Sequence, residues 1–258
     1  LALALVNYHD TFGILPSGGW RGNVVGDPDR GAGVSQPGGW SFAILPFVEQ
    51  QAIYDLGSGM TGSDRTAAFP LRDGTPISFF NCPSRRPSTT FPYTLGPPSV
   101  SDTLTYTPQY VARSDYAANV GDESGYDSFC LGIAPTTYAQ AADPNRSSRW
   151  PPGVDADTGI VFCGSELSIR SIEDGTSNTD AIGERYIDPN HYETGGAIND
   201  DWSMYHGFQD DNTASVYYNQ LFELTPLQDT PQLELREPFG SAHPAGCHIS
   251  MCDGSVQF

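Results

Sequence analysis

Apolar residues in this 258-residue chain recur mostly in short runs, and few follow the period of a long helix. The opening segment, residues 1–8 (LALALVNY), is an exception because it is rich in Leu and Ala and apolar nearly all round. So short a helix is marginal alone, so we expect it to end a longer helix whose N-terminal part is missing here. Residues 13–39 follow with nine glycines and three prolines, which predict a loop.

A second helical pattern runs from Trp40 to Leu56. Pro46 interrupts it and predicts a kink, or a helix that begins near this proline. From residue 77 onward, short apolar runs between turn residues predict strands at Ile77–Asn81, Leu104–Val111, Gly159–Cys163, Thr179–Gly183, Ala214–Leu224 and Cys247–Cys252. Residues 121–152 show no period and predict a long insertion loop.

The clearest local signal lies at the C-terminus. Residues 247–252 (CHISMC) alternate with a period of two, and residues 255–258 resume after Asp253-Gly254. Asp-Gly between two such runs favours a type I′ turn, in which both central residues need a positive φ. The chain is therefore predicted to end on a β-hairpin.

The amino-acid composition excludes some functions and indicates the kind of fold. The chain has 31 acidic and 12 basic residues, a net charge of −19, and no lysine. Such a surface repels polyanions, which argues against nucleic-acid binding and against docking on an anionic membrane. The 28 glycines and 21 prolines indicate a loop-rich, largely β chain.

No catalytic motif is present in the sequence. Ser177 and Ser255 lack the G-x-S-x-G context of a nucleophile elbow, and neither H-E-x-x-H nor a P-loop occurs. We therefore expect no catalytic residues, no bound organic cofactor and no enzyme activity, with an envelope enzyme as the weakest alternative.

Acidic clusters are candidate calcium ligands, because hard oxygen donors suit this cation. The candidates are Asp155, Asp157, Asp200, Asp201, Asp210 and Asp211. The spacing around Asp155 begins like a calcium loop, but none of the clusters has the closing glutamate, so solvated acidic loops are the alternative.

Zinc is not expected at the C-terminal hairpin, although His243, Cys247, His248 and Cys252 are suitable residue types. Neighbours on a strand point to opposite faces, and His248 and Cys252 would lie about 13 Å apart. One zinc ion cannot bind all four. In an oxidising compartment two disulfides and one thiol are possible, and the spacing leaves the pairing open among Cys82, Cys130, Cys163, Cys247 and Cys252.

Six segments share their order with the motifs of a known family. They are Asn7-Tyr8-His9-Asp10, the segment from Trp40 to Gln50, Asn81-Cys82-Pro83-Ser84, the segment from Asp115 to Gly121, the segment from Ile172 to Thr179 with Gly183-Glu184, and His243 followed after nine residues by Asp253-Gly254. Together they resemble a bacterial prepilin-like family of unknown function, related to secretion pseudopilins, with a C-terminal H-x9-D-G signature.

The resemblance implies an α+β, type IV pilin-like fold. Residues 1–12 would end a cleaved helix that inserts in the inner membrane and packs as the spine of a filament. Residues 13–258 would form a single β-rich head, an antiparallel sheet with long loops and the C-terminal hairpin. Related pseudopilins also carry calcium in the head. Asp180 departs from the family because an apolar strand residue is usual there, which questions the burial of that strand.

We expect two of these motifs to have structural rather than catalytic roles. We expect His243 and Asp253 to form a structural pair that braces the terminal hairpin around Gly254, with the Asp253 carboxylate orienting the histidine. Asp174 and Asn178 are expected to close a turn, with Glu184 accepting hydrogen bonds that support it.

These observations predict a structural subunit of an extracellular or envelope pilus-like or pseudopilus-like filament, which acts by self-association into a helical homo-polymer. The membrane would be contacted only through the missing helix, and the location would be extracellular or periplasmic. The alternative is a soluble extracellular module that binds a glycan or a small solute. Many tyrosines follow residue 100, and they suit subunit contacts, sugar stacking or ordinary sheet packing.

Overall fold

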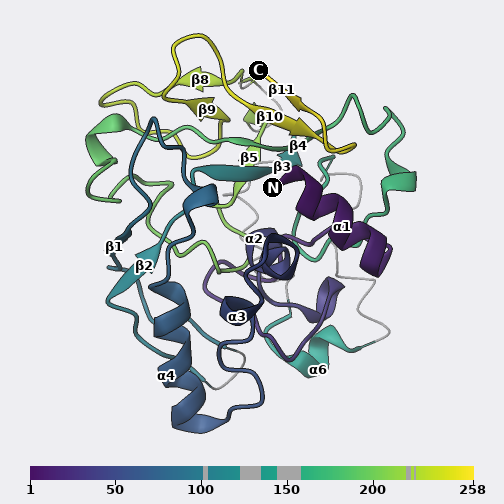
Figure 1. Ribbon diagram of the computed structural model, residues 1–258, viewed down its shortest axis with the longest axis vertical. Helices are drawn as coiled ribbons and strands as arrows, with labels where there is room; N and C mark the ends of the chain where they lie inside the picture. The colour runs from purple at the N-terminus through teal and green to yellow at the C-terminus, as the bar shows by residue number, and fades with distance from the viewer. Residues whose placement is uncertain (101–103, 123–134, 144–157, 219–221, 224) are drawn as a thin grey trace.

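A computed structural model describes residues 1–100, 104–122, 135–143, 158–218, 222–223 and 225–258. Its centre is a five-stranded sheet in the order β11-β10-β4-β3-β5 (Figure 1). The strands are β3 (Tyr116–Gly121), β4 (Asp180–Glu184), β5 (Thr213–Ser215), β10 (Ile249–Met251) and β11 (Val256–Gln257). All neighbours are antiparallel except β3 and β5, so the antiparallel prediction holds for most of a mixed sheet.

Outside this sheet, the described residues form three pairs of short strands. β1 (Thr90–Pro92) pairs antiparallel with β2 (Tyr110–Ala112), and β6 (Tyr217–Tyr218) pairs in the same way with β7 (Phe222–Glu223). β8 and β9 are parallel, and they span Leu227–Gln228 and Gly240–Ser241. The molecule is thus of the mixed α+β class, with much of the chain in loops.

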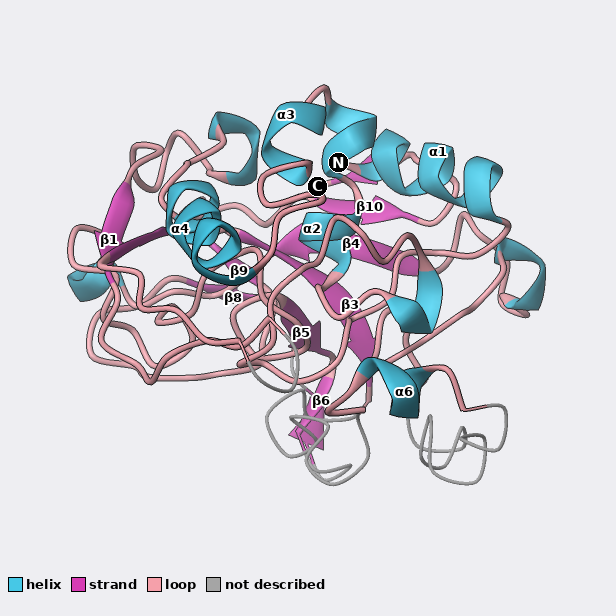
Figure 2. Ribbon diagram, turned by 90° about the horizontal axis from the view of Figure 1, so that it is seen from below, coloured by secondary structure: helices cyan, strands magenta, loops and turns pink. Residues whose placement is uncertain are grey.

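The N-terminal helix α1 (Ala2–Phe12) runs beyond the apolar segment 1–8 and ends at residue 12, as the family resemblance implied. Gly13 follows it with a left-handed φ of 75°. Ala4 and Leu5 on its inner face share a core cluster with Ala118 of β3 and Ile182 of β4. Figure 2 shows α1 running over the part of the sheet that contains β10 and β4. No helix in the described part of the chain is long and apolar enough to cross a membrane.

The predicted helix from Trp40 to Leu56 is broken into three short pieces. They are α2 (Trp40–Ala43), the 3-10 helix η2 (Leu45–Val48) and α3 (Gln51–Tyr54). The prediction of a helix start near Pro46 is confirmed, because Pro46 lies in the first turn of η2, where its missing N–H costs nothing. Glu49, with a left-handed φ of 61°, then ends η2.

One long helix was not predicted. α4 (Gly62–Asp73) contains Pro70 and has few apolar residues, so its sequence has no clear apolar stripe. Thr61 at the N-cap and Asp64 in the first turn are start signals that the sequence analysis did not use. It buries Phe69 and Arg72, and the Arg72 guanidinium lies 4.4 Å from the centroid of the Phe69 ring. The remaining helices are η1 (Gly33–Ser35), η3 (Ser78–Phe80), α6 (Tyr138–Ala141), η5 (Ile169–Ser171) and η6 (Pro189–His191).

Some predicted strands are confirmed and others are wrong. β10 lies within its predicted segment, and β4 matches its segment but extends one residue beyond it, to Glu184. The predicted segment Ala214–Leu224 is divided among β5, which begins one residue earlier, β6 and β7. Ile77–Asn81 instead contains η3, and only the end of Leu104–Val111 joins β2. Gly159–Cys163 is buried but not a strand, because both Ile160 and Val161 donate to a single carbonyl, that of Asn119, rather than forming a ladder.

The doubt about Asp180 is resolved by its place at the start of β4. Asp180 is half-buried, and burial raises the pKa of its carboxyl, whereas the four residues that follow are buried. Residues 144–152 and most of the predicted insertion loop lie outside the described residues.

Candidate functional site

A buried network of charged groups sets the positions around the site. Five arginines have 6% or less of their surface exposed: Arg72, Arg85, Arg86, Arg113 and Arg185. The carboxylate of Asp200 forms ion pairs with both Arg86 and Arg185. The pKa of this carboxyl is lowered to about 2 because the two cations outweigh the effect of burial. Guanidinium groups suit such burial, since they are weakly hydrated and donate several hydrogen bonds at once.

The turn that carries Cys82 is held by this network. Asp115, just before β3, accepts the backbone N–H of Cys82 at 2.8 Å and the Nε–H of Arg86 at 2.8 Å. The N–H of Arg85 returns to the Cys82 carbonyl at 3.0 Å and closes the turn. Cys82 is a buried free thiol, and burial raises its pKa.

Glu184 ends β4 and has an almost fully buried side chain. Its Oε2 accepts the backbone N–H of His248 at 2.9 Å and the hydroxyl of Ser241 at 3.1 Å. Its Oε1, although buried, has no hydrogen-bond partner among the described residues. Burial alone would raise the pKa of Glu184, but its hydrogen bonds, the first of them from His248, lower it.

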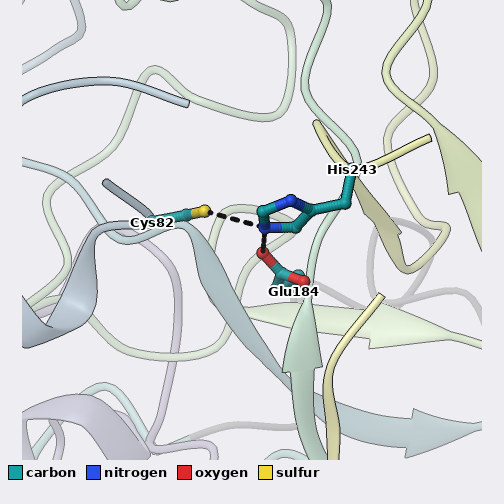
Figure 3. Close-up of side chains that lie close together, drawn as sticks. All are labelled: Cys82, Glu184 and His243. Atoms are coloured by element: carbon teal, nitrogen blue, oxygen red, sulfur yellow. Dashed lines mark hydrogen bonds and ion pairs between the residues drawn. The ribbon is translucent and has the colours of Figure 1, made fainter. Parts of the chain in front are cut away.

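His243 comes from the loop between β9 and β10. Its Nε2 lies 3.6 Å from Cys82 Sγ and 3.7 Å from Glu184 Oε1 (Figure 3). The three donor atoms all lie within 4.8 Å of one another, and no other group of three His, Cys, Asp or Glu residues in the described ranges meets this condition. We call Cys82, Glu184 and His243 the Cys-Glu-His cluster.

The geometry of the Cys-Glu-His cluster does not suit nucleophilic catalysis. In a thiol-histidine-acid relay, the thiol contacts one ring nitrogen and the acid orients the ring through the other. Here Sγ and Oε1 both approach Nε2 of His243. The thiol pKa is also raised rather than lowered, which is the reverse of an activated cysteine. Three donor atoms that face a common centre are instead typical of a metal site.

The histidine and the aspartate of the H-x9-D-G segment contact different residues. Asp253 is exposed and accepts the N–H of Ser255 at 2.8 Å, and Gly254 has the expected positive φ of 87°. β10 and β11 form the predicted hairpin around them. His243 faces Glu184 and Cys82, whereas Asp253 binds Ser255, so the prediction that His243 and Asp253 form a pair is wrong.

The second motif forms its turn without Glu184. The Asn178 side-chain amide donates to the Asp174 carbonyl at 2.9 Å, and Gly175 has a φ of 87°. Glu184 instead binds Ser241 and His248, as described above.

Four of the calcium candidates are described, and they are not solvated loops. Asp200, Asp210 and Asp211 are buried and Asp201 is half-buried. Asp200 pairs with Arg86 and Arg185, Asp210 with Arg236 and Asp211 with Arg113. One oxygen of each of Asp201, Asp210 and Asp211 is nevertheless buried without a hydrogen-bond partner in the described structure. Burial and then repulsion by Asp210 raise the pKa of Asp201 to about 6. Asp155 and Asp157 lie outside the described residues.

The sequence-based argument on metals missed this cluster because it considered neighbours in the sequence. It tested His243 with Cys247, His248 and Cys252, whereas the structure places His243 beside residues 161 and 59 positions earlier in the chain, Cys82 and Glu184. A signal was present: each member of the cluster lies in a different one of the six motifs, namely C-P-S, G-E and H-x9-D-G.

The fold and the cluster define a β-rich α+β protein with a compact sulfur, nitrogen and oxygen donor set. A family model, SBP_bac_10, described as a protein of unknown function (DUF1559), matches residues 1–258, and the chain belongs to this family. No curated protein and no solved structure matches the chain.

Proposed function

We propose that this chain is the head of a pilin-like subunit that assembles into an extracellular or envelope filament and acts by self-association. One observation carries the proposal: α1 packs on the sheet through Ala4 and Leu5, and its first turn borders an apolar cavity at the surface. This cavity of about 230 Å³ is lined by Leu1, Ala2, Phe79, Tyr116, Ile182, His248, Ser250 and Val256.

Exposed apolar side chains are present on α1 and on the hairpin. Leu3 is 68% exposed, Val256 61% and Phe258 65%. Large apolar side chains left in water on neighbouring elements mark a surface that can bury area against another copy. A second copy that covers them would bury α1 in the way that a spine helix requires.

Charge opposes this association. Each copy carries −19, so repeated copies repel one another unless salt screens the charge or a divalent cation binds it. At about 1 M salt the Debye length falls to about 3 Å, which removes most of this repulsion. Calcium is the cation that we propose for this role. Asp201, Asp210 and Asp211 each retain one unpartnered carboxylate oxygen, but these three oxygens do not all lie within 4.8 Å of one another, so they do not form a single three-carboxylate site.

An oxidising location fits the cysteines. Cys163 is disulfide-bonded, with its partner outside the described residues, whereas Cys82, Cys247 and Cys252 are free. Structural disulfides persist mainly in extracellular and periplasmic compartments, which supports the location that we propose.

Sedimentation velocity over a concentration series, with negative-stain microscopy of the same samples, tests the proposal. We expect larger species as salt or calcium is added and smaller ones with a chelator at low salt. Leu3→Glu and Val256→Glu should weaken association by placing a charge on the apolar surface. Leu71→Glu is the matched control, since Leu71 is 66% exposed on α4, away from α1 (Figure 1). A monomer under every condition contradicts the proposal.

A second candidate, a module that binds a small solute, is favoured by one observation. A cavity of about 240 Å³ adjoins the cluster and is lined by Pro226, Leu227, Gln228, His243, Pro244, Ala245, Gly246 and Cys247. A monomer that binds a solute or glycan in calorimetry, and loses that binding on Leu227→Glu, would support this function instead.

A further inference from the structure

We propose that Cys82 Sγ, Glu184 Oε1 and His243 Nε2 bind one zinc ion, which ties together three segments that are distant in the sequence. The segments are the turn after η3, the end of β4 and the loop before β10. Figure 3 shows the three side chains directed toward one another from these segments.

The distances fit the bond lengths of zinc. Zinc lies about 2.3 Å from sulfur and about 2.1 Å from nitrogen or oxygen, so at tetrahedral angles two such donors are about 3.4–3.6 Å apart. The observed separations are 3.6 Å for Sγ and Nε2 and 3.7 Å for Nε2 and Oε1. The third pair, Sγ and Oε1, lies within 4.8 Å, so a bound cation would draw these two atoms together by at most about 1.2 Å.

The two oxygens of Glu184 give an independent observation. Oε2 is held by Ser241 and by the N–H of His248, whereas Oε1 is buried, without a hydrogen-bond partner in the described structure, and faces His243. A buried carboxylate oxygen without a partner is costly, and a bound cation would satisfy it. Hydrogen bonds to the other oxygen are the usual way in which a protein orients a carboxylate ligand.

The donor set selects the metal. A thiolate is a soft ligand that hard cations such as Ca²⁺ and Mg²⁺ avoid, whereas zinc binds sulfur, imidazole and carboxylate together. A thiolate and a carboxylate also neutralise the two positive charges of zinc. The 29% exposure of the His243 side chain and the adjoining cavity leave room for a fourth ligand, water or an external group.

Zinc content and affinity test the proposal. The purified chain is stripped with a chelator, reloaded with zinc and titrated against a chromophoric zinc indicator. We expect about one zinc per chain, and a loss of affinity greater than about 100-fold in Cys82→Ser, Glu184→Gln and His243→Gln. Ser241→Ala removes the hydrogen bond to Oε2 and also the one that Ser241 Oγ accepts from the backbone N–H of His243, and it should cost about 10-fold, in the range of outer-shell partners. Cys252→Ser is the matched control, because Cys252 is a buried free thiol of the apolar core, and it should bind like the original chain.

Cobalt provides a second measurement on the unchanged chain, which remains informative if a variant fails to fold. Cobalt in place of zinc should give a thiolate-to-metal charge-transfer band and the intense visible bands of a tetrahedral ion. Competition by zinc should remove both. No zinc uptake by the original chain, no thiolate band, or undiminished affinity in folded Cys82→Ser and His243→Gln would each overturn the proposal.

Discussion

Asp200 holds the buried network together, and its replacement by asparagine tests the electrostatic account most directly. Asp200→Asn keeps the shape of the side chain but removes the charge that Arg86 and Arg185 share. Both guanidiniums then remain buried with one carboxylate fewer, and Asp115 still pairs with Arg86. Asp200 is completely buried, so solvent cannot replace the lost interaction.

The magnitude follows from two independent considerations. Removing one partner of a buried ion pair costs about 3–5 kcal/mol. The pKa of Asp200 is lowered to about 2 from 3.8, and at about 1.4 kcal/mol per pKa unit this corresponds to about 2–3 kcal/mol. We therefore expect Asp200→Asn to lower the free energy of unfolding by about 3 kcal/mol at pH 7.

The assay is urea unfolding monitored by tryptophan fluorescence, repeated from pH 7 downward. Because the folded pKa is lowered, the stabilisation is present above the unfolded pKa of about 3.9 and is lost as the pH falls through about 2. The difference between the two proteins should thus be constant from pH 7 to 5 and shrink below about pH 4. Asp10→Asn, on an exposed carboxylate of α1, is the control and should change stability by less than about 0.5 kcal/mol. A loss below about 1 kcal/mol at pH 7 would refute the reasoning.

Two further changes test other parts of the structure. Asp201 has a raised pKa of about 6, so its protonated form is favoured by folding, and this stability is present below about pH 3.9 and lost as the pH rises through 6. Asp201→Asn should therefore stabilise the protein at pH 7.5 by about 1–2 kcal/mol after allowance for solvent screening, and should not stabilise it at pH 4. Thermal unfolding with and without calcium also shows whether a bound cation gives the same stabilisation. A stability with the same pH dependence in both proteins contradicts the account. Leu5→Ala should cost about 3–4 kcal/mol in urea unfolding, because Leu5 is 3% exposed in the core between α1 and the sheet, and a cost under about 1 kcal/mol would show that α1 is not packed there.

Local signals in the sequence predicted the elements whose conformation depends on neighbours in the chain. The hairpin around Asp253-Gly254, the turn at residues 174–178 and the helix start at Pro46 each follow from backbone preferences of one or two residues. Membership of a family of unknown function is also confirmed, because a family model matches residues 1–258. The pilin-like assembly stays a proposal.

The acidic clusters show where local reasoning was wrong about burial, although calcium binding there stays a prediction. Residues 199–201 and 210–212 read as solvated loops or calcium ligands, because acidic side chains are usually exposed. The structure buries most of them against arginines from other segments, as in the pairing of Asp200 with Arg86. The missed helix α4 likewise depends on the burial of Phe69 and Arg72 against distant loops rather than on its own propensity.

The Cys-Glu-His cluster shows most clearly the difference between local sequence signals and tertiary packing. The amino-acid order supplied its chemistry, a cysteine, a glutamate and a histidine in three recognisable motifs, together with the turns and strand ends on which they lie. Their meeting within 4.8 Å depends on the pairing of β4 with β10 and on the ion pairs that hold the Cys82 turn. Side-chain chemistry and backbone preference act over a few residues, whereas the distance between residues 82, 184 and 243 is set by the packing of the whole chain.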